Sequence, residues 1–323
     1  MTPQYRLTLR RHYGRLSLAL LIYYVVTAAA QFAAQYAVLA WAPQWAEAGW
    51  FAPALAFLPM YGIGFPLFLW LLPKAPPREL LPEKRSVPGR ELLPILLMCL
   101  GVLYPGNLLG QGLDWLLRSL FRSSSGGNAL DVLMDSSSTW AFLLVAVVLA
   151  PIMEELTFRK LLLDRMRTID KPSALFFTAL AFGLFHSTVV QFFYAFGVGL
   201  IFGCIYLRTG RIVYSMALHV VINLLGSAAA LFLMGDLDLT NLDPAALMEQ
   251  LLPLLGLGIY ALVLIAGSIA GIVLLVRHRR SLRVADEGDR LGSGSRFTLV
   301  FCRPGWLLYC LAALAVIVIS YLI

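Results

Sequence analysis

A pair of adjacent carboxylates stands inside an apolar run of this sequence, with a cation four residues later. Glu154 and Glu155 lie in the run that begins at Thr139, roughly 22 Å from its outer end if it is helical. Glu155 and Arg159 would share a helix face, so the cation can neutralise Glu155 while Glu154 points elsewhere. Pro151 removes a backbone hydrogen bond just before the pair and predicts a kink. Because charge at membrane depth costs at least ~2.5 kcal/mol, the pair indicates a functional site or a solvated helix end.

Two histidines occupy the apolar runs that follow. His186 comes four residues after Phe182, and Asn223 comes four residues after His219, so each pair would share a helix face. Alone, His186 is equally well explained as a hydrogen-bonding contact between membrane helices, and for the His219–Asn223 pair such a contact is the favoured explanation. Together they indicate convergence, because polar groups inside a membrane must meet each other or a water-filled cavity. The predicted site comprises six residues: Glu154, Glu155, Arg159, His186, His219 and Asn223.

These residue types predict hydrolysis of a carbonyl compound. Glu154 would accept a proton from a confined water that His186 orients. His219 and Asn223 would donate hydrogen bonds to the oxyanion that forms on the attacked carbonyl. No serine or cysteine is placed beside a base in a way that favours a covalent nucleophile, although Ser215 stands four residues before His219.

The same residue types could bind a metal ion. Zinc is a candidate cofactor, with Glu154, His186 and His219 as candidate ligands, since Glu and His are common zinc ligands. The chain has no HExxH sequence, the familiar pattern of zinc peptidases. A metal-bound water and a metal-free, glutamate-activated water therefore both stay open.

The elements that would position these residues are membrane helices. The chain of 323 residues is 60% hydrophobic and 13% charged, with a mean hydropathy of +0.80, whereas soluble domains are about 25% charged. Its apolar residues fall in runs of membrane-spanning length without period-two alternation. We therefore predict an all-α, polytopic transmembrane helical bundle of about eight to nine membrane helices. The candidate spans are 16–40, 51–72, 91–113, 139–155, 173–190, 192–207, 212–234, 251–276 and 305–323.

Counting along straight helices leaves one expected conflict of depth. His186 would lie about 20 Å from the cytoplasmic end of its helix, and His219 only about 10 Å from the end of its own. If the two histidines meet, at least one of these helices must be tilted, kinked or begin outside the bilayer.

The positive charges predict the orientation of the bundle. With a cytoplasmic N-terminus, only Arg118 and Arg122 fall on the outer side, and the rest of the 25 Lys and Arg residues face the cytoplasm. This distribution follows the positive-inside rule, so the net charge of +7 predicts membrane topology and no nucleic-acid partner. The expected location is a bacterial inner (plasma) membrane, with the lipid bilayer as a partner.

Three motifs in this order resemble the CPBP intramembrane protease family. They are EExxxR at Glu154–Arg159, FxxxH at Phe182–His186 and HxxxN at His219–Asn223, and the stretch Gly203–Ile212 is similar to the family's Gly-rich turn. The family includes the type II CAAX prenyl endopeptidases and bacterial proteins of bacteriocin processing and self-immunity. The resemblance implies a helical protease core open to the cytoplasm. It also implies Glu154 as general base, His186 as water partner, His219 and Asn223 as oxyanion site, and Glu155 with Arg159 as support.

On this basis the chain divides into three parts. Residues 1–138 are expected to be N-terminal membrane helices that act as scaffold, with about three spans. Residues 139–234 are expected to form the CPBP-like protease core, and residues 235–323 the C-terminal membrane helices with a cytoplasmic basic loop. No oligomeric state is predicted.

The predicted function is an intramembrane endopeptidase, glutamic or metallo in type. It would hydrolyse a peptide bond in a membrane-anchored, possibly lipid-modified, protein or peptide. Two alternatives use the same residues differently. One is a proton-coupled transporter, because buried Glu, His and Arg also serve as proton relays. The other is a non-catalytic self-immunity or scaffold protein of the membrane.

Overall fold

Helices make up all the regular structure in the residues that the computed structural model describes, which are 3–74, 83–121, 138–167, 170–228, 244–279, 284 and 293–322. Within them, seven helices are long and apolar enough to cross a membrane. Two shorter apolar helices cover Lys171–Phe185 and Ile212–Gly226. The predicted polytopic helical bundle is therefore confirmed.

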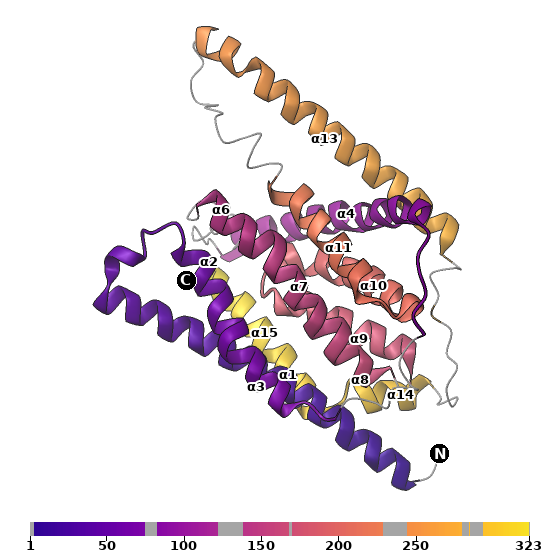
Figure 1. Cartoon of the computed structure of the whole chain (residues 1–323). Coiled ribbons are helices and arrows are strands. Elements are labelled where there is room, and N and C mark those ends of the chain that lie inside the picture. Colours follow the sequence, from indigo (N-terminus) through magenta and orange to yellow (C-terminus); the bar gives the residue numbers. More distant parts are fainter. Residues whose placement is uncertain are drawn as a thin grey trace.

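The elements follow one another in three groups (Figure 1). The first group is α1 (Pro3–Trp41), η1 (Pro43–Trp45), α2 (Phe51–Leu58), η2 (Pro59–Gly64), α3 (Phe65–Leu71) and α4 (Gly89–Phe121). The second is α6 (Thr139–Phe142), η4 (Leu143–Leu149), α7 (Ala150–Glu155), η5 (Leu156–Leu163), α8 (Asp164–Met166), α9 (Lys171–Phe185), α10 (Val189–Thr209), α11 (Ile212–Asn223) and η6 (Leu224–Ala228). The third is α13 (Pro244–His278), α14 (Ser293–Val300) and α15 (Pro304–Leu322).

The predicted span 173–190 is wrong at its C-terminal end. Helix α9 ends at Phe185, and α10 begins at Val189. Between them Ser187 adopts a left-handed backbone with φ of 56°, and Thr188 caps α10 by accepting a hydrogen bond from the Gln191 N–H at 3.2 Å. A left-handed residue followed by a helix N-cap breaks the helix, although the residues around it stay apolar. His186 thus ends a helix instead of lying inside one.

The predicted Gly-rich turn is also smaller than its sequence suggests. Gly203 lies in the middle of α10, and the chain turns only at Gly210, whose φ is 61°. The Gly210 N–H bonds to the Tyr206 carbonyl at 2.8 Å, which is a glycine-terminated helix end. The end of the span predicted over 212–234 and most of the predicted basic loop lie outside the described residues.

Segments predicted on one side of the membrane do lie at one end of the bundle. Arg165 donates to the Pro73 carbonyl at 2.8 Å, and His12 Nε2 donates to the Arg165 carbonyl at 2.8 Å. At the opposite end, the Ser138 N–H bonds to the Gly49 carbonyl at 2.7 Å. The grouping of the loops therefore agrees with the charge distribution, while the cytoplasmic orientation of the N-terminus remains a prediction.

Two packed regions enclose the middle of the chain. The largest buried apolar cluster joins α1, η5, α9 and α15, and a second joins α4, α10 and α11. Helix α4 approaches both α10 and α13 closely because glycines line its contacts. A methyl group on Gly110 would stand 2.6 Å from the Val190 carbonyl, and one on Gly101 2.6 Å from the backbone of Gly271. Small residues of this kind let membrane helices pack backbone to backbone. The helices that carry the predicted site are thus held from two sides.

Candidate active site

The two carboxylates lie on a helix whose winding changes around them. Thr139–Met166 is one continuous helical stretch in which the α-helical turn α7 is flanked by the π-helical segments η4 and η5. Pro151 cannot donate a backbone hydrogen bond, and just before it the Ala150 N–H bonds to the carbonyl of Val145, five residues back. π-Helical turns inside helices are rare and concentrate at functional sites. Here the two π-helical segments flank the short α-helical segment α7, and Glu154 and Glu155 are its last two residues.

Glu155 is fully buried and bound on two sides. Arg159 Nε lies 3.3 Å from Glu155 Oε2, which is the ion pair that the spacing of four predicts. His219 Nδ1 lies 3.1 Å from Glu155 Oε1. Since a carboxylate oxygen accepts, His219 Nδ1 carries a hydrogen. Glu155 thus joins the helix of the carboxylates to α11.

Glu154 occupies a different environment from its neighbour. Its side chain is 17% exposed, and its Oε2 lies 3.6 Å from His219 Nε2. This separation is longer than a hydrogen bond. Glu154, Glu155, Arg159 and His219 together are called the site cluster below. Within it, Glu154 is the carboxylate that an incoming group can reach.

Arg159 is held between two aromatic rings. Its guanidinium carbon lies 4.4 Å from the ring centre of Phe182 and 5.5 Å from that of Phe202. Such cation–π contacts gain strength when the cation is removed from water. Phe202 on α10 also packs on the His219 ring at 5.1 Å. The sequence gives no signal for Phe202, because one phenylalanine among many in an apolar helix looks like lipid-facing or core packing.

His186 reaches the site cluster through Phe182. Its Nδ1 lies 2.8 Å from the Phe182 carbonyl oxygen, so Nδ1 donates and a neutral ring presents Nε2 as an acceptor. The Phe182 ring packs edge-on against both His186, at 4.8 Å, and His219, at 5.9 Å. Because Nδ1 turns back to the carbonyl of the preceding turn, the His186 ring lies on the N-terminal side of its own backbone position. This backward fold reduces the conflict of depth between the two histidines.

Asn223 lies one turn beyond His219 on α11. Its Nδ2 donates to the Ala146 carbonyl in η4 at 2.9 Å, so it ties α11 to the helix of the carboxylates. Ser215, one turn before His219, is buried and donates to the Ile212 carbonyl at 3.0 Å. The structure therefore brings all six predicted residues to one region, with Asn223 bound to backbone.

The described residues contain no ready cluster of three zinc ligands. Nowhere in the described ranges do three His, Cys, Asp or Glu side chains come close enough to hold one ion. Of the three candidate ligands, Glu154 Oε2 and His219 Nε2 lie 3.6 Å apart, and Glu155 holds His219 Nδ1, so Nε2 is the His219 nitrogen left to face an ion.

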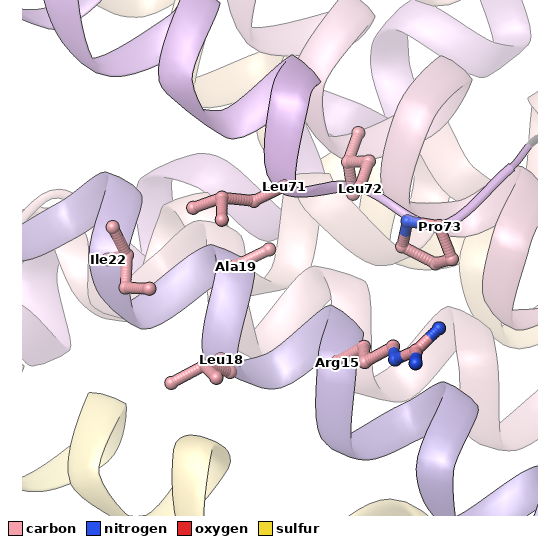
Figure 2. A pocket seen from close by; sticks show the side chains of 7 residues that line it. All are labelled: Arg15, Leu18, Ala19, Ile22, Leu71, Leu72 and Pro73. Atoms are coloured by element: carbon pink, nitrogen blue, oxygen red, sulfur yellow. The ribbon is translucent and has the colours of Figure 1, made fainter.

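One described cavity lies away from the site cluster, between α1 and α3 (Figure 2). It measures about 270 Å³ and contains none of the six predicted residues. Its lining is apolar apart from one cation: Arg15, Leu18, Ala19, Ile22, Leu71, Leu72 and Pro73. With a single ionisable group and no acid or histidine, this cavity offers no hydrolytic chemistry.

Comparison with known protein families identifies the segment that contains the site cluster. Residues 136–225 match the family model described as type II CAAX prenyl endopeptidase Rce1-like. These residues form an Rce1-like domain of the CPBP intramembrane proteases. No curated protein and no solved structure matches the chain.

The Rce1-like domain contains all six predicted residues and covers under a third of the chain. At family level it is the domain of a CAAX-type intramembrane peptidase, carried here by a multi-pass membrane protein. Its limits fall near those predicted for the protease core, 139–234. The helices α1 to α4 and α13 to α15 lie outside it.

Proposed function

We propose that this protein hydrolyses a peptide bond in a membrane-anchored, lipid-modified protein or peptide, using a water activated by Glu154. The observation that carries the proposal is the unequal environment of the two adjacent carboxylates. Glu155 is buried against Arg159 and His219, whereas Glu154 is partly exposed. A general base must be reachable by water and substrate, and a supporting carboxylate need not be.

The reaction follows from these positions. Glu154 takes a proton from water, and the resulting hydroxide attacks the carbonyl carbon of the scissile bond. The tetrahedral intermediate then collapses, the C–N bond breaks, and Glu154 returns its proton to the departing amine. His186, whose Nδ1 is held by Phe182, offers Nε2 to orient the water. Water is thus consumed and Glu154 regains its charge.

His219 is proposed as a donor to the oxyanion, which sets a condition on its protonation. Its Nδ1–H is directed at Glu155, so Nε2 carries a hydrogen only when the ring is an imidazolium. Asn223, on the same face of α11, is proposed as the second donor.

The substrate class follows from where the base lies. Glu154 sits among helices long and apolar enough to span a membrane, so a peptide held at the membrane meets it more readily than a soluble one. A lipid chain on the substrate would lie in the bilayer beside these helices.

The test compares wild-type protein with Glu154→Gln in nanodiscs containing membrane-anchored, prenylated reporter peptides. Loss of a general base is expected to lower kcat by about 10²- to 10⁴-fold, while the unfolding midpoint stays unchanged. Glu91→Gln, an exposed carboxylate at the start of α4, is the matched control. Cleavage by Glu154→Gln at the wild-type rate would sink the assignment.

Two further arms separate the remaining mechanisms. Loss of cleavage in a zinc chelator, restored by added zinc, would replace the metal-free base with a metal-bound water. Proton-driven solute flux into proteoliposomes, without any cleaved product, would favour a transporter instead.

A further inference from the structure

The first helix, α1, touches the turn that carries His186, although it lies outside the Rce1-like domain. The Tyr24 hydroxyl lies 2.6 Å from the Ser187 Oγ. The Tyr24 ring is fixed by edge-on contacts with Phe185 at 5.9 Å and with Tyr309 of α15 at 5.4 Å. A tyrosine ring packed on two sides delivers its hydroxyl to one place.

The residue that Tyr24 holds is conformationally unusual. Ser187 is the one non-glycine residue with positive φ among those described. A left-handed serine is strained, and strained residues persist only where surrounding contacts fix them. The local contacts are the Ser187 N–H to the Leu184 carbonyl, at 3.1 Å, and the Ser187 hydroxyl to the Phe185 carbonyl, at a long 3.4 Å. The contact from outside the turn is the hydroxyl pair with Tyr24. Tyr24 therefore contributes the tertiary contact of a turn that local bonds alone hold weakly.

His186 directly precedes this turn and depends on it. Its backbone N–H reaches only the Gly183 carbonyl, at 3.4 Å, so helix α9 has loosened by this point. The imidazole keeps its direction through the Nδ1 bond to the Phe182 carbonyl. A shift of the turn at Ser187 would move the His186 backbone and break that alignment.

Tyr23, the residue before Tyr24, brings α1 close to a second part of the site. Tyr23 stacks on Phe68 and packs against Phe185, both at 5.1 Å. Its hydroxyl lies beside Thr157 and within electrostatic reach of Glu154. Consecutive tyrosines of one helix thus reach the helix of the carboxylates, at Thr157, and the turn beside His186, at Ser187.

We propose that Tyr24 is a positioning residue for His186, acting through its hydrogen bond to Ser187. The inference rests on the proposed function, in which His186 orients the attacking water. Tyr24 touches none of the reacting atoms. The turn that it fixes sets where His186 Nε2 points, so the N-terminal helices complete the active site of the Rce1-like domain.

The experiment removes each hydroxyl separately and both together. Tyr24→Phe keeps the ring and its packing, and Ser187→Ala keeps the chain length and the left-handed strain. Each is expected to lower kcat about tenfold, equivalent to ~1.4 kcal/mol, with KM unchanged. The double variant should fall no further than Ser187→Ala alone, since Ser187→Ala already removes the bond to Tyr24 together with the bond to the Phe185 carbonyl. Tyr321→Phe is the matched control. Tyr321 lies near the C-terminal end of α15, and the substitution removes its 2.6 Å hydrogen bond to Asp114 of α4.

A second readout needs no cleavage. The rate at which diethylpyrocarbonate modifies His186 is followed by mass spectrometry, with exposed His278 as internal reference. Tyr24→Phe and Ser187→Ala should change the His186 rate, while Tyr321→Phe should not. An unchanged His186 rate in both variants overturns the inference, whether or not Tyr24→Phe folds, because Ser187→Ala tests the same bond.

The two proposals fail in different ways. If wild-type protein cleaves nothing while the His186 rate responds to Tyr24→Phe, the proposed function fails and the positioning role stands. If Glu154→Gln abolishes cleavage while Tyr24→Phe and Ser187→Ala retain wild-type kcat, the positioning role alone is overturned.

Discussion

Two buried charge clusters lie along a single helix of this protein, and they are built differently. The site cluster comprises Glu154, Glu155, Arg159 and His219. The second, the Asp164 cluster, comprises Lys160, Asp164, Arg167 and Tyr206, and its carboxylate lies about two and a half helical turns beyond Glu155. Both centre on a buried carboxylate paired with a cation of the same helix, so a count of charges alone does not tell them apart.

The Asp164 cluster satisfies its carboxylate completely. Lys160 Nζ donates to Oδ2 at 2.9 Å, and Arg167 Nε lies 3.3 Å from Oδ1. The Tyr206 hydroxyl lies 3.0 Å from both oxygens. A fully bonded buried network rigidifies the fold and offers nothing to a reacting group.

The site cluster leaves polar atoms unmatched. Glu155 Oε2 is held by its 3.3 Å ion pair with Arg159 Nε but has no partner of hydrogen-bond geometry, and both terminal nitrogens of Arg159 are buried without a hydrogen bond among the described residues. Aromatic rings, which accept weakly, cover the guanidinium instead. Buried groups in this state cost free energy, and such costs are tolerated mainly at functional sites. The contrast teaches that incomplete bonding, more than burial or charge, separates a reactive cluster from a structural one.

The largest effect on stability is expected from Arg159→Met. It leaves Glu155 buried with one partner fewer, which should lower the free energy of unfolding by about 3–5 kcal/mol. The measurement is reversible unfolding in mixed micelles. Arg118→Met, whose Asp114 pair is more exposed, is the matched control and should cost far less.

A double variant sharpens this prediction. Glu155→Leu combined with Arg159→Met replaces the ion pair with apolar groups, which is often neutral or stabilising. Stability should return in the double variant while cleavage does not. Recovery of cleavage would mean that the buried pair merely stabilises the fold.

Asp164→Asn is expected to have an intermediate effect. The amide keeps the shape but loses charge-assisted bonds, each worth about 1.5–3 kcal/mol, so the unfolding free energy should fall by a similar amount. The kcat of the folded fraction should match wild type, because Asp164 holds no reacting group. A large fall in kcat at unchanged stability would place the Asp164 cluster in the reaction and break the comparison.

Much of the bundle could be predicted from the sequence because its signal is long-range and additive. Each predicted span overlaps a described helix, and seven of the described helices are long and apolar enough to cross a membrane, which takes about twenty apolar residues. The break after His186 could not be predicted. The break depends on one left-handed serine, Ser187. The run Phe185 to Val190 contains no glycine or proline, the residues from which a break is usually predicted. The π-helical segments could not be predicted from hydropathy either, because π-helical and α-helical turns contain the same apolar residues.

The site shows the same division between local and tertiary information. The Glu155–Arg159 pair follows from a spacing of four on one helix, so the sequence predicts it. The bond from His219 to Glu155 depends on how α11 packs against α7, which no spacing encodes. Tyr24 lies more than 100 residues before the Rce1-like domain, in helices that sequence reasoning treats as scaffold. Its contact with Ser187 exists only in the folded chain.

The smallest effect on stability is expected from Lys160→Met. This substitution tests the comparison between the site cluster and the Asp164 cluster. Lys160 and Arg159 are adjacent cations that serve different clusters. The Lys160 side chain is 42% exposed, so water screens its pair with Asp164, and Arg167 and Tyr206 remain as partners. The loss should be no more than about 1 kcal/mol and should shrink as salt is raised. The measurement is the same micelle unfolding at low and high salt. A different result is that Lys160→Met lowers the free energy of unfolding as much as Arg159→Met does. The number of hydrogen bonds to each carboxylate would then not distinguish the two clusters, and burial of the helix alone would explain both losses.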